Sequence, residues 1–308
     1  MIINETPYAN SLFEQPWWLN IVAQGKWNEV YSKDKNGIII GRLPYVFQNK
    51  RIYMPKLTQN IGIWIDPKFA HDYGTQKKII IDLVKQLPES KDCTICLSPN
   101  NEYVLPFKWL GLSYEPSFTY RICDLTNIDE IYKKFNKTVK KNIKYAKNKV
   151  NIVDDFNFNN LWELQNKTYE NQNRSNPLDK ELLKRITNVS IETKHGRYFE
   201  AKDTEGNLHA SVFLVFDEQV CYYLIGGSDI KYRSSGAQSL LLWESIKFAA
   251  QKSQVFDFEG SNIEGIENFF RQFGGICVPL YIVRKSSLMN QFWEILKPSI
   301  KRLLGYKM

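Results

Sequence analysis

The stretch from Cys221 to Gly275 carries most of the information about fold and function. It begins CYYLIGGSD (221–229), continues KYRSSGAQSLLLWESIKFAAQ (231–251) and ends VFDFEGSNIEGIENFFRQFGG (255–275). This pattern predicts a strand, a polar turn, a long helix, a second strand that ends in acids, and a helical segment punctuated by glycines. We expect the polar turn to hold a phosphate-containing ligand, with the acids providing chemistry beside it.

The turn before the long helix has the composition of an anion site. The Gly226-Gly227 pair ends the YYLI strand, and paired glycines there indicate a bulge or the close approach of a ligand. A helix N-terminus also offers unpaired N–H groups and a partial positive charge, both suited to phosphate. The alternative is an ordinary serine N-cap with a glycine in the loop. The candidate cofactor-binding residues are Gly226, Gly227, Arg233, Ser234, Ser235, Gly236 and Gln238.

Two acids stand at the end of the second strand. In VFDFEGSN, an alternating strand would place Asp257 and Glu259 on the same side, next to Gly260. Paired acids there can bind an amine or take a proton from it. The alternative is that they cap the next helix and pair with surface lysines. Phe270 and Phe273, beside paired glycines, are candidates for a substrate slot or for ordinary core packing.

Composition and length limit the class of protein. The chain has 308 residues, which favours two domains or one large one, and its 43% hydrophobic content argues against disorder. Five cysteines without the spacing of a disulfide framework or a zinc site indicate buried thiols in a reducing cytoplasm, and we expect no metal. The N-terminal sequence lacks a signal-peptide pattern, and no apolar run is long enough to predict a membrane span.

Periodicity along the chain predicts two α/β halves. A hairpin turning at Asn36-Gly37 belongs to the first half, and a meander of strands belongs to the second. We therefore expect mixed, largely antiparallel sheets flanked by helices, with a domain over 1–115 and a second domain over 116–308 that carries the donor motif. The expected helices lie at 10–30, 74–87, 128–149, 159–172, 178–192, 234–252 and 263–272.

Two basic segments leave the partner open. The formal net charge is +8 with a pI near 9.0, which allows anionic partners. The lysine-rich segment from Lys133 to Lys149 is either a solvated helix face or a surface for RNA or lipid head groups. The C-terminal helix either docks on its own core or lies on an anionic membrane surface. His209, on an expected strand, is a weak candidate for the site.

The order of several segments resembles a known family. LFEQPWWLNIVAQGKW, GRLPYVF and MPKLTQNIGIW resemble the opening of the Fem-type peptidoglycan aminoacyltransferases and their relatives. VKKNIKYAKNKVNIV resembles their entry into the second half, and the stretch from Tyr222 to Gly275 resembles their most characteristic region. These proteins belong to the GNAT acyltransferase superfamily and contain two GNAT-like halves, so the resemblance implies tandem GNAT-like domains in this chain.

The resemblance also implies a reaction. It is the transfer of an acetyl or aminoacyl group from an activated donor to a primary amine, on a cell-envelope sugar or peptide precursor. In GNAT folds a bulged strand polarises the acyl carbonyl, and the next helix N-terminus holds the donor pyrophosphate. The matching positions here are 222–227 and 233–238. Asp257 or Glu259 would take the amine proton, and Tyr222 or Tyr223 would donate to the leaving group. Candidate acceptor-binding residues are Tyr169, Arg174, Ser261, Asn262, Phe270 and Phe273.

The donor remains open between acyl-CoA and aminoacyl-tRNA as a cosubstrate, with no tightly bound cofactor expected. The GNAT pyrophosphate pattern ends in a small residue where this chain has Gln238, which counts against acyl-CoA. The chain also lacks the long coiled-coil insertion that some Fem-type enzymes use around tRNA, which counts against tRNA. A third hypothesis is a non-catalytic protein that binds a glycan or nucleotide sugar. We expect no DNA partner, a cytoplasmic location, and possible contact with the inner membrane face through the C-terminal helix.

Overall fold

The computed structural model describes residues 3–260 and 264–285. The chain divides into two compact units that interleave along the sequence. The C-unit comprises the described residues of Met1–Glu5, Gln15–Val22 and Ser117–Pro279. The N-unit comprises those of Thr6–Glu14, Ala23–Pro116 and Leu280–Met308. The main boundary, between Pro116 and Ser117, falls near the expected one. Two N-terminal segments belong to the C-unit, and most of the last strand belongs to the N-unit. Whether these units are separate domains stays a prediction.

The N-unit is a mixed sheet with short helices. Its strand order is β1-β2-β3-β5-β12, with β4 paired to β2, and β3–β5 is its parallel pair. The expected hairpin forms between β1 and β2, with Gly37 at a positive φ of 81° in its turn. The elements are η1 (Leu12–Glu14), β1 (Trp27–Lys33), β2 (Ile39–Gln48), β3 (Arg51–Ile52), β4 (Trp64–Ile65), η2 (Pro67–Phe69), α2 (Tyr73–Lys85), β5 (Asp92–Cys96), α3 (Leu105–Trp109) and β12 (Ile276–Lys285).

The C-unit strands follow in the order β6-β11-β10-β9-β8-β7, in which β10–β11 is parallel and the other pairs that include β8, β9 and β10 are antiparallel. Its strands are β6 (Ser113–Ile122), β7 (Asn151–Val153), β8 (Gly196–Lys202), β9 (Leu208–Phe216), β10 (Val220–Ser228) and β11 (Val255–Asp257). Its helices are α1 (Pro16–Val22), α4 (Ile128–Lys134), α5 (Lys137–Ala146), α6 (Phe158–Glu170), α7 (Lys180–Glu192), η3 (Ile230–Ser235), α8 (Ala237–Ala249) and α9 (Glu264–Arg271).

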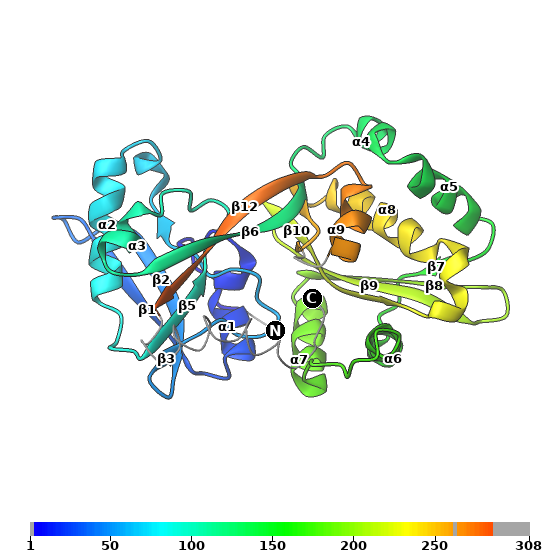
Figure 1. The fold of residues 1–308 in the computed structure, drawn as a ribbon, viewed down its shortest axis with the longest axis horizontal. Coiled ribbons are helices and arrows are strands. Elements are labelled where there is room, and N and C mark those ends of the chain that lie inside the picture. The colour runs from blue at the N-terminus through cyan, green and yellow to red at the C-terminus, as the bar shows by residue number, and fades with distance from the viewer. Residues whose placement is uncertain (1–2, 261–263, 286–308) are drawn as a thin grey trace, which may run out of the picture. The chain divides into compact units, whose positions relative to one another are not determined.

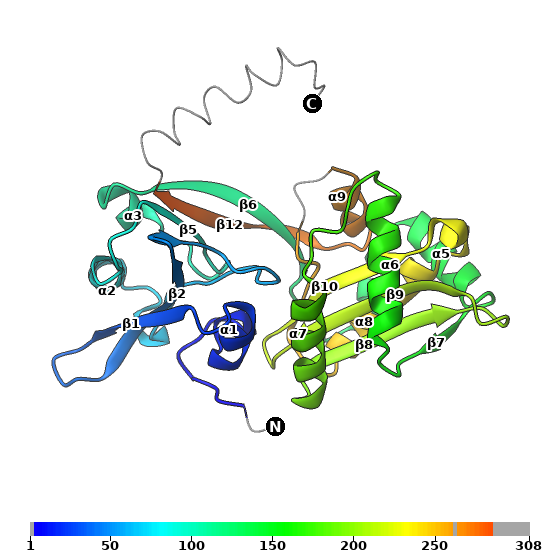
Figure 2. The same cartoon turned by 90° about the horizontal axis from the view of Figure 1, so that it is seen from below.

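Helices cover both faces of the C-unit sheet. Helix α8 packs on β8 and β9 with α5 outside it, whereas α6 and α7 pack on the opposite face (Figures 1 and 2). The mixed, largely antiparallel sheets flanked by helices confirm the predicted fold class. The elements β10, η3 and α8 follow one another directly in the chain. Because β10 is a strand of the sheet and α8 packs on that sheet, the segment that joins them is held at the edge of both.

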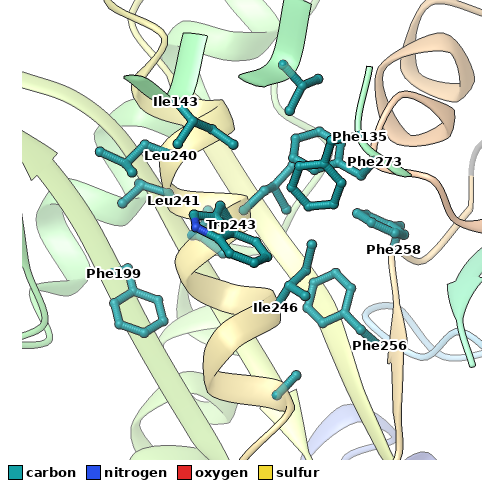
Figure 3. Packing of buried hydrophobic residues seen from close by; sticks show 14 of the residues in the cluster. Phe135, Ile143, Phe199, Leu240, Leu241, Trp243, Ile246, Phe256, Phe258 and Phe273 are labelled. Carbon is teal, nitrogen blue, oxygen red and sulfur yellow. The ribbon is translucent and has the colours of Figure 1, made fainter. Parts of the chain in front are cut away.

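Helix α8 is buried almost all round, as its sequence SLLLWESIKFAA requires. Leu240, Leu241 and Ile246 are at most 1% exposed and lie in one cluster with aromatic residues from other segments, among them Phe135, Phe199 and Phe256 (Figure 3). A helix with apolar residues on every side is stable only inside a core, because each exposed apolar face would cost transfer free energy. The core therefore fixes the position of the α8 N-terminus.

Three sequence expectations need correction. The lysine-rich segment is two helices, because Phe135 adopts an extended backbone (φ −61°, ψ 143°) and the Asn136 side chain caps α5 by accepting from the Thr138 N–H at 2.8 Å. The helix expected over 10–30 is the short pair η1 and α1, and the helix expected over 234–252 begins at Ala237. The expected C-terminal helix lies outside the described residues.

Candidate active site

The strands β10 and β11 run in parallel for only three residues each. Val220–Tyr222 pair with Val255–Asp257, and β10 then continues to Ser228 paired with β9. The register on β9 shifts between Tyr223 and Ile225, so the extra residue at 224 forms a bulge. A bulge leaves backbone groups outside the ladder, at the point where the two parallel strands stop pairing. The predicted bulged strand is therefore present.

The two glycines of β10 allow close packing. A Cβ at Gly227 would lie 2.6 Å from the Leu164 carbonyl of α6, and a Cβ at Gly226 would collide with the Tyr223 hydroxyl. The Gln165 amide donates to the Gly226 carbonyl, which ties α6 to the strand. The expected close approach is thus made by the protein itself, and neither glycine lines the cleft described below. Their predicted cofactor-binding role is not supported.

Gly236 starts α8 in a conformation that other residues resist. Its φ is +73°, and an added Cβ would lie 2.6 Å from the Asn142 carbonyl of α5. No side chain caps α8 at Gly236, and the first backbone acceptor is used by the Leu240 N–H at 3.1 Å. Helix geometry therefore leaves the N–H groups of Gln238 and Ser239 without an acceptor inside the helix. These donors and the helix dipole together favour an anion.

A cleft of about 510 Å³ opens at this helix start. Residues from α5, α6, β9, β10, η3, α8 and α9 line it. Four of the predicted cofactor-binding residues are among them: Arg233, Ser235, Gly236 and Gln238. Arg233 is exposed, so its guanidinium is available to a ligand, whereas Ser234 is exposed without lining the cleft. The cleft can accommodate a phosphate-containing ligand with both N–H donors and a cation.

His209 is a cleft residue that sequence reasoning rated weakly. Its ring stacks on Tyr232 of η3, with centroids 4.2 Å apart and planes 3° apart, and its Nε2 lies 3.2 Å from Asp203. It is 6% exposed, and its Nδ1 is buried without a partner among the described residues. The stacking holds η3 against β9. The position of His209 in an expected strand was the one feature of the sequence that indicated a place near the site. Its contacts with Tyr232 and Asp203 come from other segments, so the local pattern does not show them.

Asp257 is fully buried in an ion pair. Its carboxylate accepts from Thr119 Oγ1 at 2.5 Å, from Arg121 Nε at 2.7 Å and from the Glu259 backbone N–H at 2.7 Å. The Arg121 side chain is 10% exposed and that of Asp257 is 0% exposed. These three donors occupy the carboxylate, and Asp257 is not part of the cleft lining. Its contacts fit a positioning role, whereas the expected transfer of a substrate proton to Asp257 stays a prediction.

Glu259 differs from Asp257 in its backbone conformation and in the hydrogen bonding of its carboxyl group. The strand ends at Asp257, and Glu259 adopts a positive φ of 51°, so the two acids do not share a strand face as predicted. Its Oε1 is buried without a hydrogen-bond partner among the described residues. Burial raises the pKa of Glu259 well above its ordinary value, and the charge of Asp257 raises it further. A carboxyl group with a raised pKa is suited to accept and return a proton near neutral pH.

The two tyrosines have different surroundings. Tyr222 is 1% exposed and lies opposite Asp257 in the strand register, inside the core rather than the cleft. The Tyr223 hydroxyl accepts from Gln238 Nε2 at 2.9 Å, and burial raises the pKa of Tyr223, so the phenol is neutral. Neither tyrosine lines the cleft, but the Tyr223 hydroxyl contacts Gln238, which does, so Tyr223 is the better placed of the two proton-donor candidates.

The predicted acceptor residues are mostly not brought together. Phe270 and Phe273 are 5% and 0% exposed and belong to the core, which corrects the expectation of a substrate slot. Phe269, one residue earlier, lines the cleft instead. Tyr169 is half-buried and Arg174 is exposed, and neither is part of the cleft wall. Ser261 and Asn262 lie outside the described residues.

The lysine-rich segment lies beside the cleft. Between Lys133 and Lys149 the sequence has eight lysines and no acid. Lys133 is the one lysine of this segment with an ion pair in the described part of the chain, to Glu130. Helix α5 presents Lys137, Lys141 and Lys144 to solvent, while its Asn142 lines the cleft. The cleft rim therefore has a strongly positive potential.

The chemistry and fold together define a class. Residues 133–271 match the family model described as an acetyltransferase (GNAT) domain. This segment contains the bulged strand, the cleft and both acids, and it is a GNAT-type acyltransferase domain. The predicted superfamily and the predicted enzyme class are therefore confirmed. A comparison with curated proteins gives no match.

Solved structures extend the similarity to nearly the whole chain. The structure of FemX is similar with a TM-score of 0.68 at 13% identity, covering 94% of this chain and 95% of that one. The C-terminal domain of a putative lysylphosphatidylglycerol synthetase from Agrobacterium fabrum has a TM-score of 0.57 at 11% identity, covering 92% and 91%. A tandem GNAT protein from the clavulanic acid biosynthesis pathway has a TM-score of 0.52 at 10% identity, covering 88% of each chain. At these identities the similarity establishes the fold, which is GNAT-like with Fem-like relatives.

Two further features concern residues 3–260 and 264–285. There, no helix has the length and hydrophobicity that crossing a bilayer requires. No group of three or more His, Cys, Asp or Glu side chains in these ranges is placed to hold a metal ion. Cys93 and Cys96 are free thiols on β5, and burial raises the pKa of each to about 11.

Proposed function

We propose that the protein is an N-acyltransferase that moves an acyl group from a phosphate-containing donor to a primary amine on a cell-envelope precursor. The observation that carries this proposal is the start of α8. There, uncapped N–H donors and Arg233 face a cleft of about 510 Å³ next to the bulged end of β10. The donor phosphates would bind these groups, and the acyl carbonyl would lie against the bulge.

Glu259 would take the proton of the attacking amine. The neutral amine adds to the acyl carbonyl, the resulting ammonium loses its proton, and the bond to the leaving group breaks. The buried Oε1 of Glu259 has no competing partner among the described residues. Its raised pKa makes it a stronger base than an exposed carboxylate once it is ionised. Asp257 and Arg121 would hold the backbone of Glu259 through the 2.7 Å bond to its N–H.

Tyr223 would return a proton to the leaving group. Its hydroxyl is neutral, because burial raises its pKa, and it lies against Gly226 at the bulge. Backbone N–H groups freed by the bulge would stabilise the developing oxyanion, a contribution of about 3–4 kcal/mol to the barrier in comparable sites. Water need not enter this scheme, since both protons have a residue to carry them.

The acceptor is proposed from the relatives. The similarity to FemX and to the C-terminal domain of a putative lysylphosphatidylglycerol synthetase supports an amine or lipid-linked component of the cell envelope. The second name contains the lipid phosphatidylglycerol, and the sequence resemblance to Fem-type enzymes also implies an acceptor in the cell envelope. The particular acyl group and acceptor are left to the assay.

The test compares donors and one matched pair of variants. Purified protein is assayed with acetyl-CoA and with aminoacyl-tRNA against envelope amines, following acyl transfer by mass spectrometry. Glu259→Gln should lower turnover by about 10²–10⁴-fold. Glu264→Gln changes an exposed acid on α9 and should leave turnover unchanged. Full activity of the Glu259 variant, or the lack of transfer from either donor in the wild type, would reject the proposal.

A specific observation favours aminoacyl-tRNA as a second candidate donor. The α5 lysines beside the cleft lack acidic partners within the described residues, as a surface for a polyanion requires. Reversing Lys137, Lys141 and Lys144 to Glu should then weaken use of aminoacyl-tRNA and flatten its salt dependence. Reversal of Lys180, Lys184 and Arg185 on α7, also exposed, is the control. Equal effects of both triple variants would argue against this donor.

A further inference from the structure

The donor cleft reaches the end of β10 at Ser228 but does not reach the bulge near Leu224. Its walls include Gln238 on α8 and Phe269 on α9. Tyr223 and Ile225, which flank the bulge, are not part of its lining. A phosphate bound at the start of α8 is therefore separated from the place where the acyl carbonyl would react.

A hydrogen bond between two side chains makes this separation. Gln238 Nε2 donates to the Tyr223 hydroxyl at 2.9 Å, so it connects α8 to β10. The Tyr223 hydroxyl lies against Gly226, and its ring meets Phe270 edge to face with centroids 5.7 Å apart. The phenol thus lies along the strand over the bulge. Gln238 closes the gap between this phenol and the cleft.

The closed arrangement leaves one polar atom unsatisfied. Gln238 Oε1 is buried and has no partner among the described residues. A buried acceptor without a donor destabilises the arrangement that buries it. A ligand that supplies an N–H or O–H group to this oxygen would therefore favour a different position of the Gln238 side chain. Because that side chain has three rotatable bonds, it can swing without moving the helix.

We propose that the Gln238–Tyr223 hydrogen bond is a gate between the phosphate end of the donor cleft and the bulged strand. The gate opens for a donor whose acyl-carrying arm bears an N–H or O–H group that can bind Gln238 Oε1. This inference rests on the proposed function, because it assumes that a donor binds at the start of α8. Opening also frees the Tyr223 hydroxyl from Gln238, so the phenol becomes available when the arm arrives.

The gate acts as a specificity device. A donor fragment with phosphates but without an arm binds the outer cleft whether the gate is open or closed. A complete donor gains affinity only when its arm passes Gln238. Replacing Gln238 by Ala removes both the hydrogen bond and the bulk, so the arm can enter without displacing a side chain.

The experiment measures binding of two probes by calorimetry. The probes are coenzyme A and its nucleotide fragment 3′-phosphoadenosine 5′-diphosphate, which lacks the pantetheine arm. We expect the wild type to bind both with similar Kd values, because the arm must break the Gln238–Tyr223 hydrogen bond and this cost offsets the contacts that the arm makes. Gln238→Ala should bind coenzyme A at least about tenfold more tightly than the fragment, the gain expected from burying a few methylene groups of the arm. The fragment should bind both proteins equally.

A second variant separates gating from a structural role of Gln238. Tyr223→Phe keeps the ring but removes the acceptor of the hydrogen bond, so it should shift the ratio of the two Kd values in the same direction. Equal ratios in the wild type and both variants, with measurable binding, would overturn the gate while leaving the donor cleft in place. The absence of binding of either probe to all three proteins would overturn the gate together with the acyl-CoA form of the proposed donor.

Discussion

Replacing Gly236 by Ala tests how the start of α8 is held. The residue has a φ of +73° and sits where α5 and α8 approach, so an added methyl group would lie 2.6 Å from the Asn142 carbonyl oxygen and 3.0 Å from its carbonyl carbon. Backbone atoms of a helix cannot rotate away as a flexible side chain can. The methyl group must therefore push α8 away from α5 or change the backbone of the turn.

The expected effect has two parts. A left-handed backbone costs a residue other than glycine about 1–2 kcal/mol. Overpacking against a rigid neighbour costs typically about 1–3 kcal/mol more. Gly206, in the β8–β9 turn of the same unit, has a φ of +84° and nothing within 4 Å of an added Cβ. Gly206→Ala therefore has the first cost only, and the difference between the two variants isolates the second.

The assay is urea unfolding of both variants, followed by tryptophan fluorescence, to which Trp243, buried in the C-unit, contributes. We expect the free energy of unfolding to fall by about 1–2 kcal/mol for Gly206→Ala and by about 2–5 kcal/mol for Gly236→Ala. Binding of a nucleotide at the cleft should weaken only in the Gly236 variant. Equal stability of the two variants would refute the close approach of α5 and α8 at this position.

Two other predictions concern buried charge. Arg121→Leu removes the cation that pairs with the fully buried Asp257 and should destabilise the C-unit by about 3–5 kcal/mol, whereas Arg51→Leu, at a bridge whose arginine is 64% exposed, should cost less than about 1 kcal/mol in urea unfolding. Burial raises the pKa of Glu14 from 4.5 to about 7, so the folded state binds its proton more tightly than the unfolded state. Stability of the N-unit should therefore fall by up to about 3 kcal/mol as pH rises from 4.5 through 7, and Glu14→Gln should flatten this dependence. An unchanged pH slope in that variant would show that Glu14 is not the group responsible.

Much of the fold followed from local patterns. The hairpin at Gly37, the helix at 73–85 and the strand, turn and helix around Gly236 were all predicted within a few residues, because hydrophobic period and turn residues act over short distances. The break at Phe135 and Asn136 was missed. The break depends on the extended backbone of Phe135 at the end of α4 and on the Asn136 cap at the start of α5. The lysine-rich sequence on both sides is compatible with one continuous helix.

For the site as well, features that depend on neighbouring residues were predicted and contacts between distant residues were not. The sequence pointed to Arg233, Ser235, Gly236 and Gln238, which the structure brings together in the lining of one cleft, because glycine and serine near a helix start have restricted uses. It gave no sign of the contacts of Asp257, whose partners Thr119 and Arg121 lie more than a hundred residues away in the chain. It also placed Phe270 and Phe273 near the substrate, because an aromatic residue has the same appearance in a core and in a pocket.

By itself, the sequence determined the bulged strand, the helix start that follows it and the resemblance to GNAT acyltransferases. Those features depend on backbone conformations that particular residues favour locally. Only the tertiary structure decided which acid is paired and which is left without a partner within the described residues, and that Gln238 reaches Tyr223 across the inner end of the cleft. Burial and pairing are properties of residues brought together from distant parts of the chain, so no local pattern in Cys221–Gly275 could specify them.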